Sequence, residues 1–144
     1  MKLKTLLWCI VCVVFTTLQA QDLLITEIAD PNNDASARYV EIYNPSSDDI
    51  DLSLGYALQR WTNGSSSAQS PKALTGTIAA GGYYVVCNNP TNFLTVYGMD
   101  ASQSVGTGGP ADSNGDDNVA LIGPDGSIID MFGVAGEDLS LIHI

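Results

Sequence analysis

Short strand-like segments, each closed by a dense turn signal, run along most of this sequence. From Leu24 to Leu58 the order is strand, polar loop, strand, Asn-Pro turn, short strand, glycine and strand. Between Arg38 and Asn44, apolar and polar side chains alternate with a period of two, which is typical of a strand with one buried face. Pro45 ends that strand because it cannot donate to a ladder and restricts the residue before it.

Two further pairs of segments predict hairpins in the second half of the chain. Residues 74–78 and 83–87 flank an Ala-Ala-Gly-Gly turn, whose glycines tolerate the positive φ of a tight connection. Residues 119–122 and 127–134 flank Gly-Pro-Asp-Gly, another strong turn signal. Together the segments make roughly six to nine short strands without a long helical period, which favours an all-β sandwich in a single domain.

The remaining segments predict loops and one helical turn. Residues 63–72 and 98–118 are rich in small and polar residues, as surface loops are. A short helical turn is predicted at residues 90–97, with Thr91 as its cap. Its inward-packing side chains are expected to be Phe93, Leu94 and Tyr97.

Both ends of the chain differ from the strand-rich middle. Residues 1–20 have a basic start and an apolar run of about ten residues, the layout of a secretory signal peptide. The run is shorter than the roughly 20 residues that a membrane-spanning helix needs, and an uncleaved membrane anchor is the alternative. We therefore expect a secreted, extracellular protein whose single domain spans residues 22–138. Residues 139–144 continue no earlier pattern, and we expect them to be a non-native tail on a C-terminally truncated sequence.

The mature chain expected from this cleavage is strongly acidic. Removal of residues 1–20 leaves three cations against 16 Asp and Glu residues, a formal net charge of −13. Such a chain lacks the basic surface that nucleic-acid phosphates require, so direct nucleic-acid binding is not expected. No membrane association is expected after cleavage. Cys87 would be the one remaining cysteine, a buried and inert thiol at the end of an apolar strand.

Motifs for catalysis are lacking in the sequence. The one histidine, His143, lies in the predicted tail, so neither a Ser-His-Asp nor a Cys-His site is expected. Glu27 and Glu41 have the residue type of a glycosidase carboxylate pair. The alternative is that they face solvent, with Arg38 or Arg60 as cross-strand partners. We predict no catalytic residue and no enzymatic activity.

A run of alternating oxygen-bearing side chains gives the one metal hypothesis. Asp30, Asn32 and Asp34 have the spacing of the first ligands of a calcium loop, and Glu41 falls at its twelfth position. A similar triplet lies within residues 112–116. Neither loop has glycine at its sixth position, and the alternative is a set of solvated Asx turns. Calcium is therefore the candidate metal, and no other cofactor is expected.

Aromatic residues suggest a platform for a ligand. Trp61, Tyr56, Tyr83 and Tyr84 all lie on predicted strands, where packing in the core is the alternative role. Trp61 precedes a polar loop, so we expect it to be the exposed member that contacts a sugar or protein ligand.

The order of these motifs resembles the lamin-tail domain family. The residues that carry the resemblance are Thr26-Glu27-Ile28, Tyr39-Val40-Glu41-Ile42-Tyr43-Asn44-Pro45, Gly55-Tyr56-Ala57-Leu58 and Gly81-Gly82-Tyr83. Leu54 is inserted where the family pattern has Ser-Gly directly, and we expect it to form a β-bulge. The resemblance implies an immunoglobulin-like β-sandwich of the secreted bacterial type.

The resemblance also implies a role in binding. We expect a non-catalytic, secreted binding or structural module that contacts a protein or cell-surface partner. One alternative is an accessory domain of a larger extracellular hydrolase, such as a nuclease or phosphatase. Another is a small carbohydrate-binding module, which is the role that an exposed Trp61 would serve.

Overall fold

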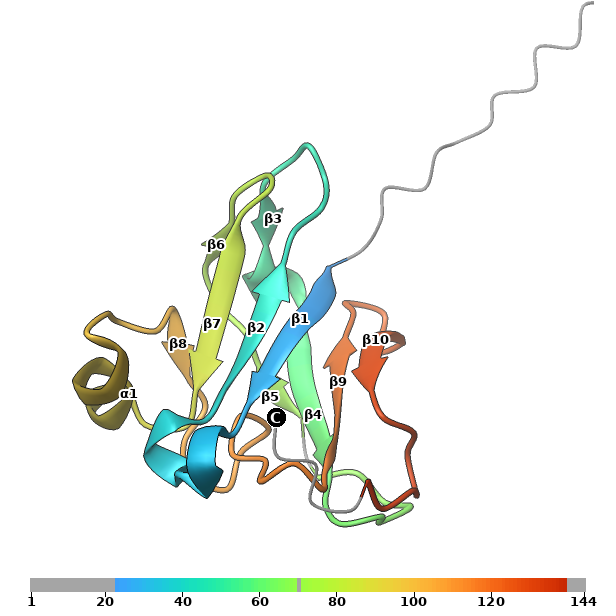
Figure 1. The fold of residues 1–144 in the computed structure, drawn as a ribbon. Coiled ribbons are helices and arrows are strands. Elements are labelled where there is room, and N and C mark those ends of the chain that lie inside the picture. The colour runs from blue at the N-terminus through green and yellow to red at the C-terminus, as the bar shows by residue number, and fades with distance from the viewer. Residues whose placement is uncertain (1–22, 70, 140–144) are drawn as a thin grey trace, which may run out of the picture.

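Two β-sheets packed face to face form the body of the protein in the computed structural model, which describes residues 23–69 and 71–139 (Figure 1). The strands, in chain order, are β1 (Leu24–Ala29), β2 (Tyr39–Tyr43), β3 (Ile50–Asp51), β4 (Ala57–Trp61), β5 (Lys72–Ala73), β6 (Thr77–Ile78), β7 (Tyr83–Cys87), β8 (Gln103–Ser104), β9 (Asn118–Ile122) and β10 (Ile128–Phe132). The helical elements are α1 (Pro90–Tyr97) and the 3₁₀ turns η1 (Pro31–Asn33), η2 (Ala35–Ala37) and η3 (Leu52–Leu54). The predicted signal peptide and most of the predicted tail lie outside the described residues.

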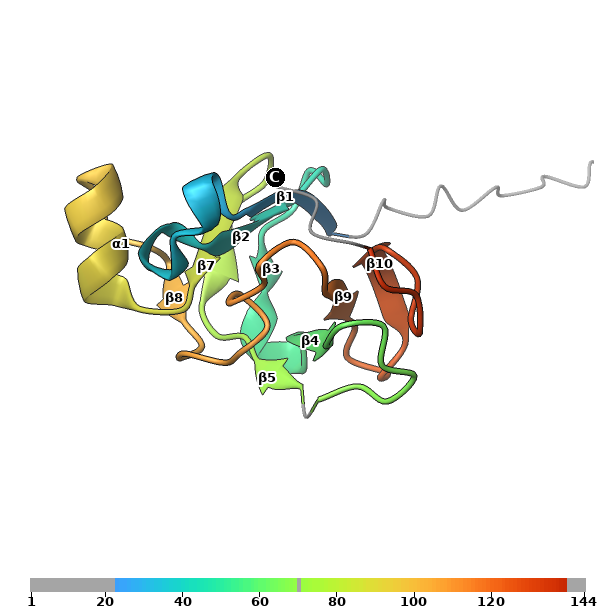
Figure 2. The ribbon, with the colours of Figure 1, turned by 60° about the horizontal axis from the view of Figure 1, so that its bottom comes forward.

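The sheets divide the strands into two layers. One sheet has the order β1-β2-β7-β8 and the other the order β10-β9-β4-β5, while β3 and β6 form a separate two-stranded ribbon. Neighbouring strands are antiparallel except β7 and β8, which are parallel. Figure 2 shows β1, β2 and β7 in one layer and β4, β5 and β9 in the other. The all-β sandwich predicted from the sequence is confirmed.

The main core lies between the two layers, where the inward side chains of the strands meet, and a smaller cluster of Ala57, Trp61, Ala120 and Ile122 forms separately. In β2 the buried residues are Val40 and Ile42, and in β7 they include Tyr84 and Val86. They meet side chains of β4 and β9, where every residue of β9 is buried. The fully buried large apolar side chains of this core include Leu23, Ile42, Leu52, Leu58, Leu74, Ile78 and Leu121.

One of the two predicted hairpins is present and the other is wrong. β9 and β10 form the hairpin predicted around Gly-Pro-Asp-Gly. β6 pairs with β3, whereas β7 pairs with β2 and β8, so segments 74–78 and 83–87 do not form a hairpin. The reason lies at Asn44, whose buried side-chain amide donates to the carbonyls of Ile78 and Ala79. These bonds hold the turn at the end of β2, and β7 then enters the sheet beside β2.

The Leu54 insertion does not make a bulge. Residues 52–54 form η3, with the Asp51 carboxylate accepting from the Ser53 N–H at 2.9 Å. Gly55 ends the turn with φ of 118°, a left-handed conformation that glycine adopts without strain. The extra residue is therefore absorbed by a 3₁₀ turn, and the Leu54 side chain is 70% exposed.

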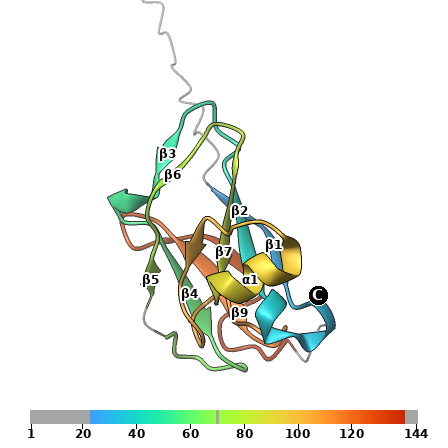
Figure 3. The same ribbon diagram turned by 90° about the vertical axis from the view of Figure 1, so that its left-hand side faces the viewer.

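The predicted helical turn is a complete helix, α1. Its cap is Asn89, whose side chain accepts from the Asn92 N–H, so the expected Thr91 cap is wrong. Phe93 packs inward as predicted, whereas Leu94 is 45% exposed. Figure 3 shows α1 next to η2, away from the β3–β6 ribbon at the top of the view. No helix among residues 23–69 and 71–139 has the length and apolar character to cross a bilayer.

Candidate functional site

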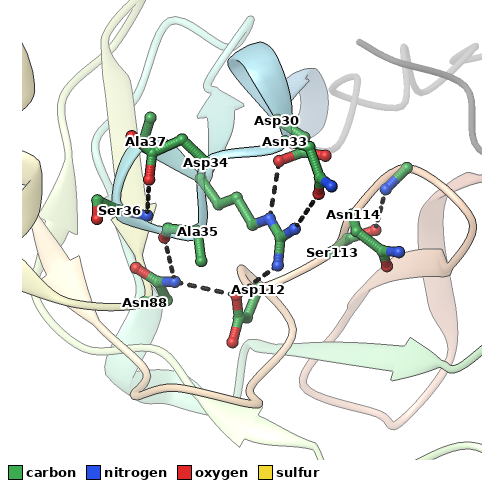
Figure 4. A network of polar contacts seen from close by, with 12 residues as sticks. Asp30, Asn33, Asp34, Ala35, Ser36, Ala37, Asn88, Asp112, Ser113 and Asn114 are labelled. Atoms are coloured by element: carbon green, nitrogen blue, oxygen red, sulfur yellow. Dashed lines mark hydrogen bonds and ion pairs between the residues drawn. The ribbon is translucent and has the colours of Figure 1, made fainter.

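Arg38 is the centre of a polar network at one end of the sandwich, between the η1–η2 loop and the 108–117 loop (Figure 4). Its Nε donates to Asp30 Oδ1 at 2.8 Å, and its Nη1 donates to Asp112 Oδ1 at 3.0 Å. Its Nη2 donates to Asn33 Oδ1 at 2.8 Å. The side chain of Arg38 is 12% exposed and that of Asp30 is 0% exposed. The largely buried side chain of Arg38 therefore links the η1–η2 loop to the 108–117 loop.

The local sequence explains how the loop reaches Arg38. Pro31 starts η1, and Asn32 and Asn33 follow with φ of 56° and 53°. Asparagine tolerates this left-handed conformation better than most residues. Asp34 then caps η2 by accepting from the Ser36 N–H at 2.9 Å. The chain thus turns back on itself and directs Asn33 toward the guanidinium.

A second arginine, on the other sheet, also forms hydrogen bonds with the 108–117 loop. Arg60 of β4 donates through Nη1 to Asp117 Oδ2 at 3.1 Å and to the Asp112 carbonyl at 2.6 Å. Its Nη2 donates to the Gly108 carbonyl at 2.9 Å. Asp117 Oδ1 also accepts from the Asn63 N–H. Residues 108–117, which are poor in apolar side chains, are therefore ordered by the two arginines.

The two aspartates of this loop respond differently to their surroundings. Burial opposes ionisation of Asp112, but hydrogen bonds from the Gly108 N–H and from Arg38 outweigh it and lower the pKa of Asp112. Burial dominates at Asp117 and raises its pKa, although the charge of Arg60 acts in the opposite direction. A buried ion pair whose acid has a raised pKa is one in which the attraction only partly offsets the loss of hydration.

The four residues predicted to bind calcium do not converge on one point. Asp30 faces Arg38, Asp34 caps η2, and Glu41 accepts from the Thr26 hydroxyl on the outer side of β2. Asn32 lies exposed within η1, in a left-handed conformation. Among the residues that the structure describes, no three His, Cys, Asp or Glu side chains gather into a group suited to a metal ion. Calcium binding stays a prediction, tested by the change in Tm in about 5 mM Ca²⁺.

The predicted aromatic platform is distributed over different parts of the molecule. Trp61 is only 8% exposed and packs with Ala57, Ala120 and Ile122, so the expectation that it is exposed is wrong. It is buried because the loop after β4 folds back over it, with the Gln69 N–H donating to the Arg60 carbonyl. The other members separate as well: Tyr84 is buried, Tyr56 packs against the core, and Tyr83 is 61% exposed.

Tyr83 belongs to a different aromatic surface, the outer face of β1, β2 and β7. Its ring lies 4.8 Å from that of Tyr43, its register partner on β2. At the other end of β2, the ring of Tyr39 meets those of Phe93 and Tyr97 edge to face, at 5.7 Å and 5.5 Å. Two tyrosine clusters thus flank the middle of β2. We call this surface, formed by the outward side chains of β1, β2 and β7, the tyrosine face.

Two glutamates occupy the middle of the tyrosine face. Glu27 of β1 and Glu41 of β2 are direct register partners. The Glu41 carboxylate accepts from the Thr26 hydroxyl at 2.8 Å. Burial and a hydrogen bond with Glu27 raise the pKa of the Tyr39 hydroxyl. Neither Arg38 nor Arg60 pairs with these glutamates, because both guanidiniums are bound to aspartates of the loops.

Among the described residues, no side chain is arranged as an activated nucleophile. Cys87 is fully buried, and burial raises the pKa of its thiol, as is typical of an inert cysteine. His143 lies outside the described residues. The sequence pattern indicates that Tyr39, Glu41 and Tyr43 share a face. It does not indicate the partnership of Tyr43 with Tyr83, because the predicted hairpin gives β7 a different neighbour.

The sequence matches a known family over most of the chain. The model of the Lamin Tail Domain matches residues 16–136. This chain belongs to the lamin tail domain family. The lamin tail domain is an immunoglobulin-like fold without enzymatic function, so the predicted family and fold class are confirmed. No curated protein matches the chain.

Proposed function

We propose that this lamin tail domain is a secreted, non-catalytic interaction module that binds a protein or cell-surface partner through its tyrosine face. The observation that carries the proposal is the exposed Tyr83 ring packed on Tyr43, on the side of the sheet that faces away from the core. Tyrosine supplies a large, rigid contact area at low entropic cost and is enriched at protein interfaces.

The proposal is tested by the binding of the fluorescently labelled protein to cells of the organism that produces it. Labelled protein is expected to bind saturably and to be displaced by excess unlabelled protein. The variant Tyr43→Ser/Tyr83→Ser is expected to lose most of this binding because it removes the central aromatic contacts. The matched control is Leu54→Ser/Ile128→Ser, which removes two exposed apolar side chains elsewhere. Equal binding by all three proteins would overturn the proposal.

Secretion and the lack of catalysis are parts of the same proposal and have their own tests. The basic and apolar start of the chain supports export, and N-terminal sequencing of the protein from culture medium is expected to begin at Gln21. The purified protein is expected to leave nucleic acids and phosphate esters intact. Hydrolysis that follows the protein through purification, at a rate above that of buffer, would argue for an unrecognised active site.

A further inference from the structure

The glutamate pair of the tyrosine face carries an uncompensated charge. Glu27 and Glu41 stand directly opposite each other on neighbouring antiparallel strands. Side chains in this relation are about 5 Å apart at Cβ, and like charges there destabilise the pair of strands. The arrangement therefore costs the folded protein free energy unless a cation lies nearby.

The described part of the chain supplies no such cation. Arg38 is held by Asp30 and Asp112, and Arg60 by Asp117. Lys72, the remaining described cation, lies on β5 at the edge of the other sheet. The pair thus presents two negative charges, with Glu27 exposed and Glu41 partly exposed.

The surroundings of the pair are suited to one kind of cation. Tyr39 and Tyr43 lie two residues before and after Glu41 on β2, about 7 Å away on the same face. Tyrosine rings attract cations over their faces, and the attraction grows as the cation loses water. The hydroxyls of Thr26 and Tyr39 engage the carboxylates and hold them in place.

We propose that the tyrosine face binds an extended, arginine-bearing segment of a partner protein, with a guanidinium seated over Glu27 and Glu41 and beside the rings of Tyr39 and Tyr43. The inference rests on the proposed function and names its partner. Arginine fits better than lysine because its planar guanidinium forms paired hydrogen bonds with carboxylates and stacks on aromatic rings. The formal net charge of −13 of the mature chain expected after cleavage would steer a cationic segment toward it.

The test uses a defined probe, a fluorescein-labelled peptide of alternating arginine and serine, with fluorescence anisotropy as the readout. The purified protein is expected to bind it, and the same peptide with citrulline in place of arginine is expected to bind at least about tenfold more weakly, because citrulline keeps the shape and loses the charge. The lysine version is expected to lie between the two. Equal affinity for the arginine and citrulline peptides would overturn the inference.

Variants locate the binding on the face. Glu27→Gln/Glu41→Gln is expected to lower the affinity for the arginine peptide about tenfold. The control Asp48→Asn/Glu137→Gln changes the net charge equally at exposed positions, and its affinity for the peptide is expected to stay within about twofold of the parent's. The glutamine variant keeps the acceptor oxygens and removes the repulsion, so it is expected to unfold at the same or a higher urea concentration than the parent. Weaker binding by a more stable protein separates recognition from a folding defect.

The failures of the two proposals are distinguishable. If cell binding depends on Tyr43 and Tyr83 but Glu27→Gln/Glu41→Gln changes neither cell binding nor peptide binding, the face recognises another chemistry and the arginine inference is wrong. A glucosamine polymer that displaces the labelled protein from cells, with no peptide binding, would also overturn the arginine inference. If cell binding does not depend on the tyrosines, the proposed function itself falls.

Discussion

Carboxylates occupy two contrasting settings in this domain. In the loops at one end of the sandwich, Asp30 and Asp117 are buried, Asp112 is partly buried, and each is bound by an arginine. On the tyrosine face, Glu27 and Glu41 oppose each other without a cationic partner among the described residues. Both arginines therefore stabilise the loops, whereas the negative charge of the two glutamates faces outward.

The difference separates structure from recognition. A buried carboxylate without its arginine would be costly, so the loop aspartates and their partners are mutually required. The opposed glutamates destabilise the pair of strands, so an external cationic partner explains their position on an aromatic surface better than a structural role does.

The largest effect is expected from Arg60→Ala. This change leaves Asp117 buried without its cation and removes the donors to the carbonyls of Asp112 and Gly108. Breaking a buried ion pair on one side costs about 3–5 kcal/mol. Urea denaturation followed by tryptophan fluorescence measures the loss, with Lys72→Ala as the exposed control. A loss below about 1 kcal/mol would show that the loop is fastened by other contacts.

A smaller loss is expected from Arg38→Ala, because its network is slightly more exposed. The free energy of unfolding should fall by roughly 1.5–3 kcal/mol, the range for hydrogen bonds to charged groups. Arg38→Lys should recover only part of this, since one ammonium cannot replace the fork that reaches Asp30, Asp112 and Asn33. Full recovery by lysine would mean that the charge alone matters. The same urea experiment compares the three proteins.

These ion pairs mark the limit of what the sequence can reveal. The strand pattern from Arg38 to Asn44 is readable because alternation is local, and it correctly places Tyr39, Glu41 and Tyr43 on one face. The arginine partners are not readable, because Arg38 and Asp112 are 74 residues apart and Arg60 and Asp117 are 57 apart. A pattern in the local sequence does not indicate pairs of residues that are so far apart.

The aromatic and turn predictions failed for a similar reason. A polar loop after Trp61 predicts an exposed ring, but that loop folds back over it. The Gly81-Gly82 turn predicts a hairpin because its signal is local, whereas the strand order depends on the amide of Asn44. Turn chemistry predicts where the chain bends, and side-chain contacts decide which strands it joins.

Acidification should affect the two loop aspartates in opposite ways. The lowered pKa of Asp112 means that its stabilising contribution is present above its unfolded value, near 3.9, and is lost as pH falls through the folded value. The raised pKa of Asp117 makes the opposite contribution to stability, because protonation at low pH removes the cost of burying its charge. Asp112→Asn should therefore be less stable at about pH 6 but lose less on going to about pH 3, by urea denaturation. A parallel loss in Asp112→Asn and in the exposed control Asp48→Asn would contradict this assignment.

The smallest effect, and the one with the opposite sign, is expected on the tyrosine face. Glu41→Gln removes one of two opposed charges while the Thr26 hydroxyl keeps an acceptor, so the free energy of unfolding should rise by about 0.5 kcal/mol. The control Glu137→Gln removes an exposed carboxylate elsewhere and should change little. Added salt at about 1 M should shrink the gain, because it screens the repulsion that the variant relieves. A loss of stability in Glu41→Gln would instead place Glu41 among the structural carboxylates. The tyrosine face would then not differ from the loops in this respect.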